Sequence, residues 1–322
     1  MTENNYAFAV AQIRSLENSL FTRNAFEQIL STKEERDILD ILLSHGYKLP
    51  FENATVNDII DHSQSDVYEL LKGHIKDAPA LKLFTVKNDF HNLKTVIKGL
   101  AGETAFEENI ISPSTVDTAT LKTAISEKKY DLLPGLLETA AKESMETLGA
   151  HFDGQMADAV IDKYTLLAYK DIAEESDSKM VKEYVDAVIS SADIKTAFRG
   201  AKTHRSEEFY NNALCGSISL DKTALTRAAR KGEDDVITYI TSVGFAKAAA
   251  ALKVSLFEFE KAVDQKIMRI IDGAVFENFS IDPLIAYGIK RENEIKNLRI
   301  CIAGVRTGDI GSVTERMCLP DV

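Results

Sequence analysis

A glycine-rich run near one end of the sequence is the first place to look for phosphate chemistry. Gly304, Gly308 and Gly311 follow an apolar run with the spacing GxxxGxxG. A nucleotide loop needs glycines that let backbone N–H groups approach a phosphate at the start of a helix. The spacing here differs from the GxGxxG of dinucleotide-binding folds. We therefore interpret the run as a surface turn.

Two other patterns contain residues that bind metals elsewhere. Asp234 and Asp235 begin like the DDxxD motif that holds magnesium on a diphosphate, but Thr238 stands at the fifth position. The pair is predicted to be a solvated helix start. His62 and Asp66, four residues apart, can share a helix face, which we interpret as structural. The sequence has no HExxH, GxSxG or Walker A motif.

Charge limits the kinds of partner. The 322 residues include 38 Lys and Arg against 50 Asp and Glu, a net charge of −12, which disfavours a general role on nucleic acid. Arg227, Arg230 and Lys231 form a small basic face, balanced by acids at 233–235. We interpret this face as solvated, with docking of an acidic partner as the alternative. The cysteines, Cys215, Cys301 and Cys318, lack CxxC spacing and are predicted to be reduced thiols.

The most informative pattern occurs three times. Each copy reads Asn or Asp, then Leu or Ile, then Lys or Arg, with Gly at the eighth position, and the copies start 101 and 104 residues apart. Such a period indicates one structural unit used repeatedly. We predict a packing role, in which the Asn or Asp caps a helix or bonds the neighbouring unit and the Gly ends the helix in the αL conformation. The nine positions are Asn92, Lys94, Gly99, Asp193, Lys195, Gly200, Asn297, Arg299 and Gly304.

A second block supports the period. Leu121 and Ala124 fall on Leu225 and Ala228 at the same offset of 104. The start of the chain joins the pattern, through apolar residues at 26, 29 and 30, only if a few residues are inserted downstream. The sequence therefore predicts three tandem helical repeats of about 105 residues, at 1–111, 112–216 and 217–322, in one continuous assembly.

The elements that carry these motifs are expected to be helices. Only 6 Pro and 16 Gly interrupt the chain, and apolar residues recur at helical spacing. An alternation of apolar residues at 298, 300 and 302 resembles a strand, but its two counterparts have helical surroundings. The predicted fold class is all-α, with helices at 9–20, 26–30, 34–44, 53–73, 85–100, 120–127, 132–148, 158–174, 179–190 and over each motif.

The sequence resembles a known family over nearly its whole length. The resemblance rests on the motif and on the segments 6–17, 87–94 and 292–300, which look like the C subunit of V-type (A/V-type) ATPases, known in eukaryotes as the d subunit. Residues 111–182 fit only by length and helical character. The stretch 303–305 departs from the more basic stretch expected there.

The resemblance implies a non-catalytic rotor subunit with no cofactor and no metal. It implies a helical funnel with pseudo-three-fold symmetry that seats on the membrane proteolipid ring and receives the shaft subunits D and F. Such a protein transmits torque between ATP hydrolysis and transport of H⁺ or Na⁺. No apolar stretch approaches the roughly 20 residues that span a bilayer. We therefore expect a cytoplasmic protein that is peripheral at the membrane through the complex.

Two other classes remain open from the residues alone. One is a helical protein-binding scaffold, although solenoid units usually have roughly 34 to 47 residues. The other is an all-α enzyme with an unrecognised site, which would need convergent titratable groups in a pocket. The sequence leaves open the transported ion, the direction of operation, the ring stoichiometry and the residues that face each partner.

Overall fold

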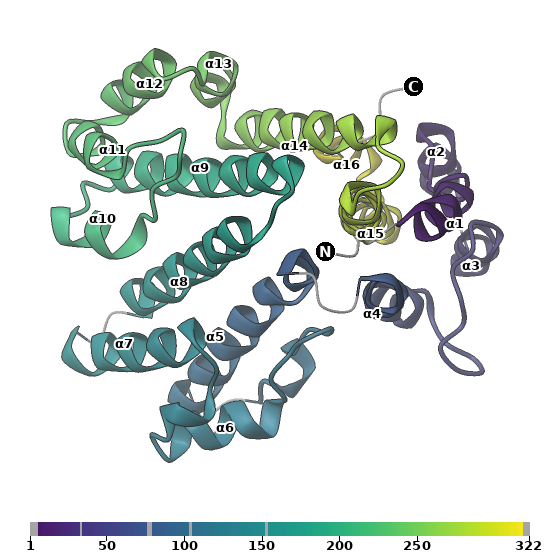
Figure 1. Ribbon diagram of the computed structural model, residues 1–322, viewed down its shortest axis with the longest axis horizontal. Helices are drawn as coiled ribbons and strands as arrows, with labels where there is room; N and C mark the ends of the chain where they lie inside the picture. The colour runs from purple at the N-terminus through teal and green to yellow at the C-terminus, as the bar shows by residue number, and fades with distance from the viewer. Residues whose placement is uncertain (1–5, 33, 76–78, 103–104, 152–153, 318–322) are drawn as a thin grey trace. The chain divides into compact units, whose positions relative to one another are not determined.

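The protein is described by a computed structural model that covers residues 6–32, 34–75, 79–102, 105–151 and 154–317. These residues form α-helices joined by loops and short 3₁₀ turns, with no strand among them, so the predicted all-α class is confirmed (Figure 1). The helices are α1 (Ala7–Glu17), α2 (Arg23–Ser31), α3 (Glu35–Ser44), α4 (Val56–His74), α5 (Val86–Gly102), α6 (Thr118–Ser126), α7 (Leu136–His151), α8 (Gly154–Glu175), α9 (Lys179–Lys202), α10 (Glu207–Ala213), α11 (Lys222–Ala229), α12 (Glu233–Ser242), α13 (Ala246–Val254), α14 (Leu256–Asp272), α15 (Asp282–Thr307) and α16 (Ile310–Arg316).

The chain forms two compact units. One joins both ends of the sequence, Met1–Leu81 and Asp264–Val322, and the other is continuous, Lys82–Val263. In the first unit, α15 packs against α1, α2, α4 and α16. In the second, α8 packs against α5, α7 and α9, and α9 against α11 and α12 (Figure 1). The three repeats at 1–111, 112–216 and 217–322 remain a prediction.

Side-chain caps explain where several helices begin. The Thr55 hydroxyl accepts a hydrogen bond from the Asp58 N–H, and the Asp58 carboxylate accepts one from the Thr55 N–H. Together these bonds form a complete capping box for α4. Ser178 caps α9, which runs unbroken to Lys202 and so joins the helix predicted at 179–190 with its motif. The strand-like alternation near residue 300 lies inside α15, as its helical counterparts indicated.

Each unit has its own apolar core. In the first unit, residues of α2, α3 and α4 pack with the second half of α15, and Ile29, Leu42 and Leu298 are fully buried. In the second, Ile194, Leu225 and other residues of α9, α11, α12 and α13 form the cluster. Burial of a large aliphatic side chain contributes about 1.5–3 kcal/mol each. These two clusters therefore stabilise the units that hold the motif helices.

A buried ion pair lies inside the first unit. Arg291 and Glu294 pair on α15 with side chains only 8% and 5% exposed. Tyr47 donates its hydroxyl to Glu294 Oε1 at 2.7 Å, and the backbone N–H of Phe21 donates to Oε2 at 2.6 Å. The Arg291 guanidinium also lies 4.4 Å from the centre of the Tyr47 ring. Burial raises the pKa of Glu294, and the Arg291 charge and these hydrogen bonds oppose that rise.

Removing one member of this ion pair should destabilise the protein, because the other charge stays buried without a partner. Glu294→Gln leaves the Arg291 charge buried without compensation, and we expect a loss of about 3–5 kcal/mol in the free energy of unfolding. Urea titration followed by helicity measures the loss. Glu35→Gln is the control, because Glu35 pairs with Arg306 at the surface (2.7 Å) and its loss should cost less than about 1 kcal/mol. Equal shifts in the two variants would contradict the analysis.

Candidate functional site

The three motif copies lie inside the long helices α5, α9 and α15. Their leading residues, Asn92, Asp193 and Asn297, are each 1% exposed or less. The apolar residue that follows each of them, at 93, 194 and 298, is fully buried. The motif is therefore part of the protein core, which fits the predicted packing role rather than direct contact with a ligand.

The leading residue of the first two copies bonds a later segment of backbone. Asn92 donates Nδ2–H to the Ile111 carbonyl and accepts the Ile111 N–H, both at 2.9 Å. Asp193 accepts the N–H groups of Cys215 and Gly216 at 3.0 and 2.6 Å. Both residues lie within their helices, so the predicted helix cap is wrong. The bonded segments also fall within the predicted repeats 1–111 and 112–216, and not in a neighbouring unit.

The third residue of each copy forms an ion pair with another long helix. Lys94 pairs with Asp162 of α8 at 2.5 Å, Lys195 with Glu260 of α14 at 3.0 Å, and Arg299 with Asp61 of α4 at 3.0 Å. Exposed pairs of this kind contribute about 0–1 kcal/mol. They reveal a shared arrangement, in which each motif helix presents its cation to an acid on a long helix.

The motif glycines act by close packing. Gly99, Gly200 and Gly304 lie within helices and none has a positive φ, so the predicted αL conformation is wrong. A Cβ atom at any of them would lie within 3.0 Å of a later side chain, that of Phe106, Tyr210 or Val313 respectively. The physical reason for glycine is therefore the approach of the segment that follows each motif helix.

Three short helices repeat with the motif, and sequence reasoning missed their caps. Thr22, Asp117 and Asp221 each accept the backbone N–H three residues further on, at the starts of α2, α6 and α11. The offsets, 95 and 104, are those of the buried apolar block that begins at 26, 121 and 225. An oxygen-bearing residue four positions before that block was the available signal.

A carboxylate on each motif helix holds the chain just before these caps. Asp89 accepts the N–H of Thr115 at 2.6 Å, and Asp186 accepts the N–H of Ser219 at 3.0 Å. Glu294 accepts the N–H of Phe21, the residue immediately before Thr22. Burial raises the pKa of Asp89, and its bonds to Thr115 oppose the rise. We call Asp89, Asp186 and Glu294 the anchor carboxylates.

These contacts define three sets of equivalent elements. Two are continuous in sequence: α5 with α6 and α8, and α9 with α11 and α14. The third combines α15 from one end of the chain with α2 and α4 from the other. The sets share hydrogen bonds, ion pairs and glycine contacts, although few of the residues involved are identical.

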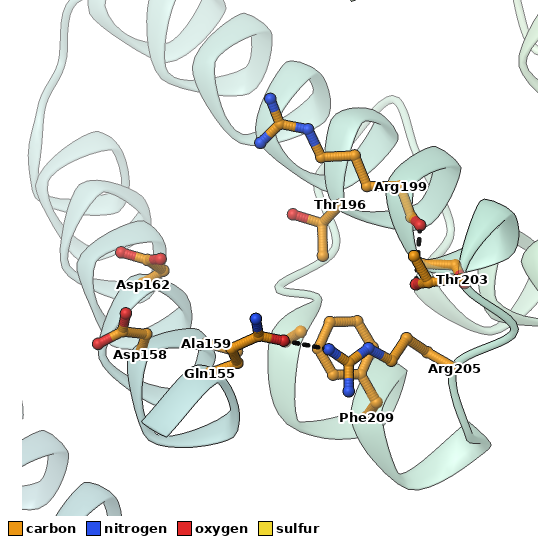
Figure 2. A pocket seen from close by; sticks show the side chains of 11 residues that line it. Gln155, Asp158, Ala159, Asp162, Thr196, Arg199, Thr203, Arg205 and Phe209 are labelled. Carbon is orange, nitrogen blue, oxygen red and sulfur yellow. Dashed lines mark hydrogen bonds between the residues drawn. The ribbon is translucent and has the colours of Figure 1, made fainter. Parts of the chain in front are cut away.

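A cleft lies beside the second motif helix. It is lined by residues of α8, α9 and α10 and has a volume of about 320 Å³. Figure 2 shows Asp158 and Asp162 on one wall and Arg199 on the other. The two aspartates are paired with Lys98 and Lys94, at 2.6 and 2.5 Å. These charges neutralise each other, so the cleft offers no convergent acid and base.

An arginine lines the same cleft. Arg205 donates to Gln155 and stacks over the Phe209 ring, with its guanidinium carbon 5.2 Å from the ring centre (Figure 2). Among the described residues, no group of three His, Cys, Asp or Glu is placed to hold a metal ion. The cleft is thus a place where residues of α8, α9 and α10 meet.

The chemistry-bearing patterns of the sequence have structural positions. Gly304 lies within α15, Gly308 ends it with φ 74°, and α16 begins at Ile310, so the predicted surface turn is only the short link between two helices. Asp234 and Asp235 are exposed in the first turn of α12, as predicted. His62 and Asp66 share a face of α4, with Nε2 and Oδ1 3.4 Å apart.

Comparisons with known proteins identify relatives over most of the chain. Residues 9–312 match the family model described as the ATP synthase (C/AC39) subunit. The C subunit of the V-type sodium ATPase of Enterococcus hirae is 24% identical over 313 residues, which cover 95% of each chain. The C subunits of the A-type ATP synthases of Haloferax volcanii and Methanocaldococcus jannaschii are 24% and 23% identical, covering 84% and 93% of this chain and 78% and 82% of theirs.

This protein thus belongs to the ATP synthase C/AC39 subunit family, and the resemblance found in the sequence is confirmed. Its members are accessory subunits of V- and A-type ATPases rather than catalytic ones. None of the helices formed by the described residues is long and apolar enough to cross a membrane.

The glycine contacts predict a clear difference between two substitutions. Gly200→Ala places a Cβ 2.7 Å from Tyr210 Cε1 and should destabilise the protein by about 1–3 kcal/mol through overpacking. Gly73→Ala, in a helix with no neighbour within 4 Å, should instead be neutral or stabilise by up to about 1 kcal/mol. Thermal unfolding of both variants decides it; similar melting temperatures would refute the packing role.

The buried carboxyl group of Asp193 should make the free energy of unfolding depend on pH. Burial raises its pKa to about 6, and the N–H bonds from Cys215 and Gly216 oppose the rise. Its stabilising contribution is present below the unfolded pKa near 4 and is lost as the pH rises through about 6, by up to ~3 kcal/mol. Asp193→Asn should therefore gain stability relative to wild type between pH 4 and pH 7, measured by urea unfolding.

The matched variant for this test is Asp234→Asn, which removes an exposed carboxylate of α12 and controls for the change in net charge. The quantity to compare is the pH dependence of the difference from wild type, because the altered hydrogen bonds add only a constant. A difference for Asp193→Asn that does not change between these pH values would overturn the assignment.

Proposed function

We propose that this protein is a non-catalytic rotor subunit that links the central shaft of a V-type ATPase to its membrane ion-carrying ring. The observation that carries the proposal is the match over residues 9–312 to the C/AC39 subunit family. The relatives named as the C subunits of a sodium ATPase and of ATP synthases support it. In this role the protein transmits torque between ATP hydrolysis and transport of H⁺ or Na⁺.

The internal contacts suit a part that bears torque. Such an adaptor must resist deformation, and close-packed helices with satisfied buried polar groups are stiff. The anchor carboxylates and motif glycines brace all three sets of helices. We propose three repeats, at 1–111, 112–216 and 217–322. Each anchor carboxylate joins one of them to another, as expected of a funnel with pseudo-three-fold symmetry.

We propose the shaft subunits D and F and the proteolipid ring as the partners. The protein would then be cytoplasmic and held at the membrane through the complex. The net charge of −12 and the 27% charged residues favour polar contacts with the shaft, which can form and separate more readily than a large apolar interface. Charge complementarity should therefore matter more than buried area.

The shaft contact is tested by mixing the tagged protein with purified D and F and measuring the mass of the complex under native conditions. We expect a one-to-one-to-one complex that weakens when salt is raised from about 50 to about 300 mM, because salt screens exposed charges. Circular dichroism of the protein alone at each salt concentration is the control. Failure to form a complex while the protein remains helical would contradict the shaft linkage.

A separate experiment addresses the ring. Proteoliposomes that contain the purified proteolipid ring should retain the protein during flotation, whereas liposomes of the same lipids without the ring should not. Equal retention by both would indicate lipid binding and would contradict the proposed seat on the ring.

A further inference from the structure

A basic groove runs along α10 and α11. It is an open cleft of about 480 Å³, and four of the residues that line it are cations: Lys222, Arg227, Arg230 and Lys231. Glu207 is the acid in its lining. A concentration of positive charge at one place is notable in a chain whose net charge is −12. We call this cleft the α11 groove.

The corresponding surface of α2 lacks three of these cations, although Arg23 stands at the position of Lys222. A second cleft is lined by Gln28, Ser31 and Thr32 among others. These residues precede Arg227, Arg230 and Lys231 by 199 positions, the combined offset of the two capped helices. The capped helix and its buried face therefore form equally well without cations at these positions. The charges of Arg227, Arg230 and Lys231 are therefore not needed for the fold.

Ion pairs within the protein do not neutralise all the positive charge of the α11 groove. Arg230 pairs with Glu207, and Lys231 lies 3.9 Å from Asp235, both at exposed positions. Arg227 makes no side-chain hydrogen bond or ion pair with any residue that the structure describes. At least one guanidinium of the groove is therefore available to an anion.

Lys222 strengthens the positive field at the inner wall. Its Nζ donates to the Asn211 carbonyl at 2.8 Å. Burial and the neighbouring charge of Lys163 lower its pKa, and the Asp193 carboxylate opposes that shift. Like charges held close together in a partly desolvated place are unfavourable for the free protein, and a bound anion would relieve that repulsion.

We propose that the α11 groove is a docking site for an acidic segment of a partner protein. The cations extend along residues 222–231, a helical rise of roughly 14 Å, which about four residues of an extended chain would span. Their spread along the helix suits several carboxylates in sequence better than one compact anion. A nucleic acid is disfavoured by the net charge. The proposal does not depend on the ATPase assignment.

The test uses the whole protein and a fluorescein-labelled oligoglutamate, with binding measured by fluorescence anisotropy at about 50 and about 200 mM NaCl. The variant Arg227→Gln, Arg230→Ser and Lys231→Thr gives α11 the residues that α2 carries. We expect it to bind about tenfold more weakly than the wild type, because three exposed charge pairs are lost. Arg227→Gln alone should also weaken binding, and it breaks no internal pair.

The matched control replaces three exposed cations elsewhere: Lys87→Thr, Lys247→Gln and Lys253→Ser. It changes the net charge equally and should bind within about twofold of the wild type. The proposal is overturned if the wild type shows no saturable binding, or if both triple variants lose affinity equally. It is also overturned if inorganic pyrophosphate displaces the peptide at stoichiometric concentration, because the groove would then be a small-anion site.

Discussion

Where the chain leaves a long helix, its buried backbone N–H and C=O groups need hydrogen-bond partners inside the protein. This requirement organises both units. Asp89, Asp186 and Glu294 supply acceptors from within the motif helices to the chain that enters the next capped helix. Asn92 and Asp193 accept the N–H groups of Ile111 and Gly216, which lie a few residues earlier in the same connections. Because an unsatisfied buried N–H costs about 1–3 kcal/mol, these side chains fix the path of each connection. Core packing, glycine contacts and ion pairs follow from that path.

The helices and the repeated motif could be predicted because both depend on local spacing. The role of the glycines could not, because a helical glycine and a helix-ending glycine look alike in sequence. What decides the role of Gly200 is the position of Tyr210, ten residues later, after the chain has turned back. Asp186 could not be predicted for a related reason. Asp89 lies three residues before the first motif copy, and the same spacing before the second copy gives Ser190. Asp186 lies one helical turn earlier, and only the folded structure shows that it accepts the N–H of Ser219.

The three sets of helices keep their interiors alike while their surfaces differ. Helix caps, buried apolar blocks and anchor carboxylates recur in all three sets. The cap of α2 is Thr22, whereas the caps of α6 and α11 are aspartates. On the outside, Ser31 of α2 corresponds to Ser126 of α6 and to Arg230, the residue that follows α11. Interior positions are constrained by packing density, whereas exposed positions tolerate most side chains. Related units can thus acquire different binding surfaces on one shared frame.

The set that draws on both ends of the chain affects how the protein is made. Synthesis delivers α1–α4 first, yet α15, against which α1, α2 and α4 pack, emerges from the ribosome only near the end. The continuous unit Lys82–Val263 is complete in the interval. Domains generally fold as units during synthesis. The N-terminal helices must therefore wait, with their apolar faces uncovered, while the middle of the chain folds first.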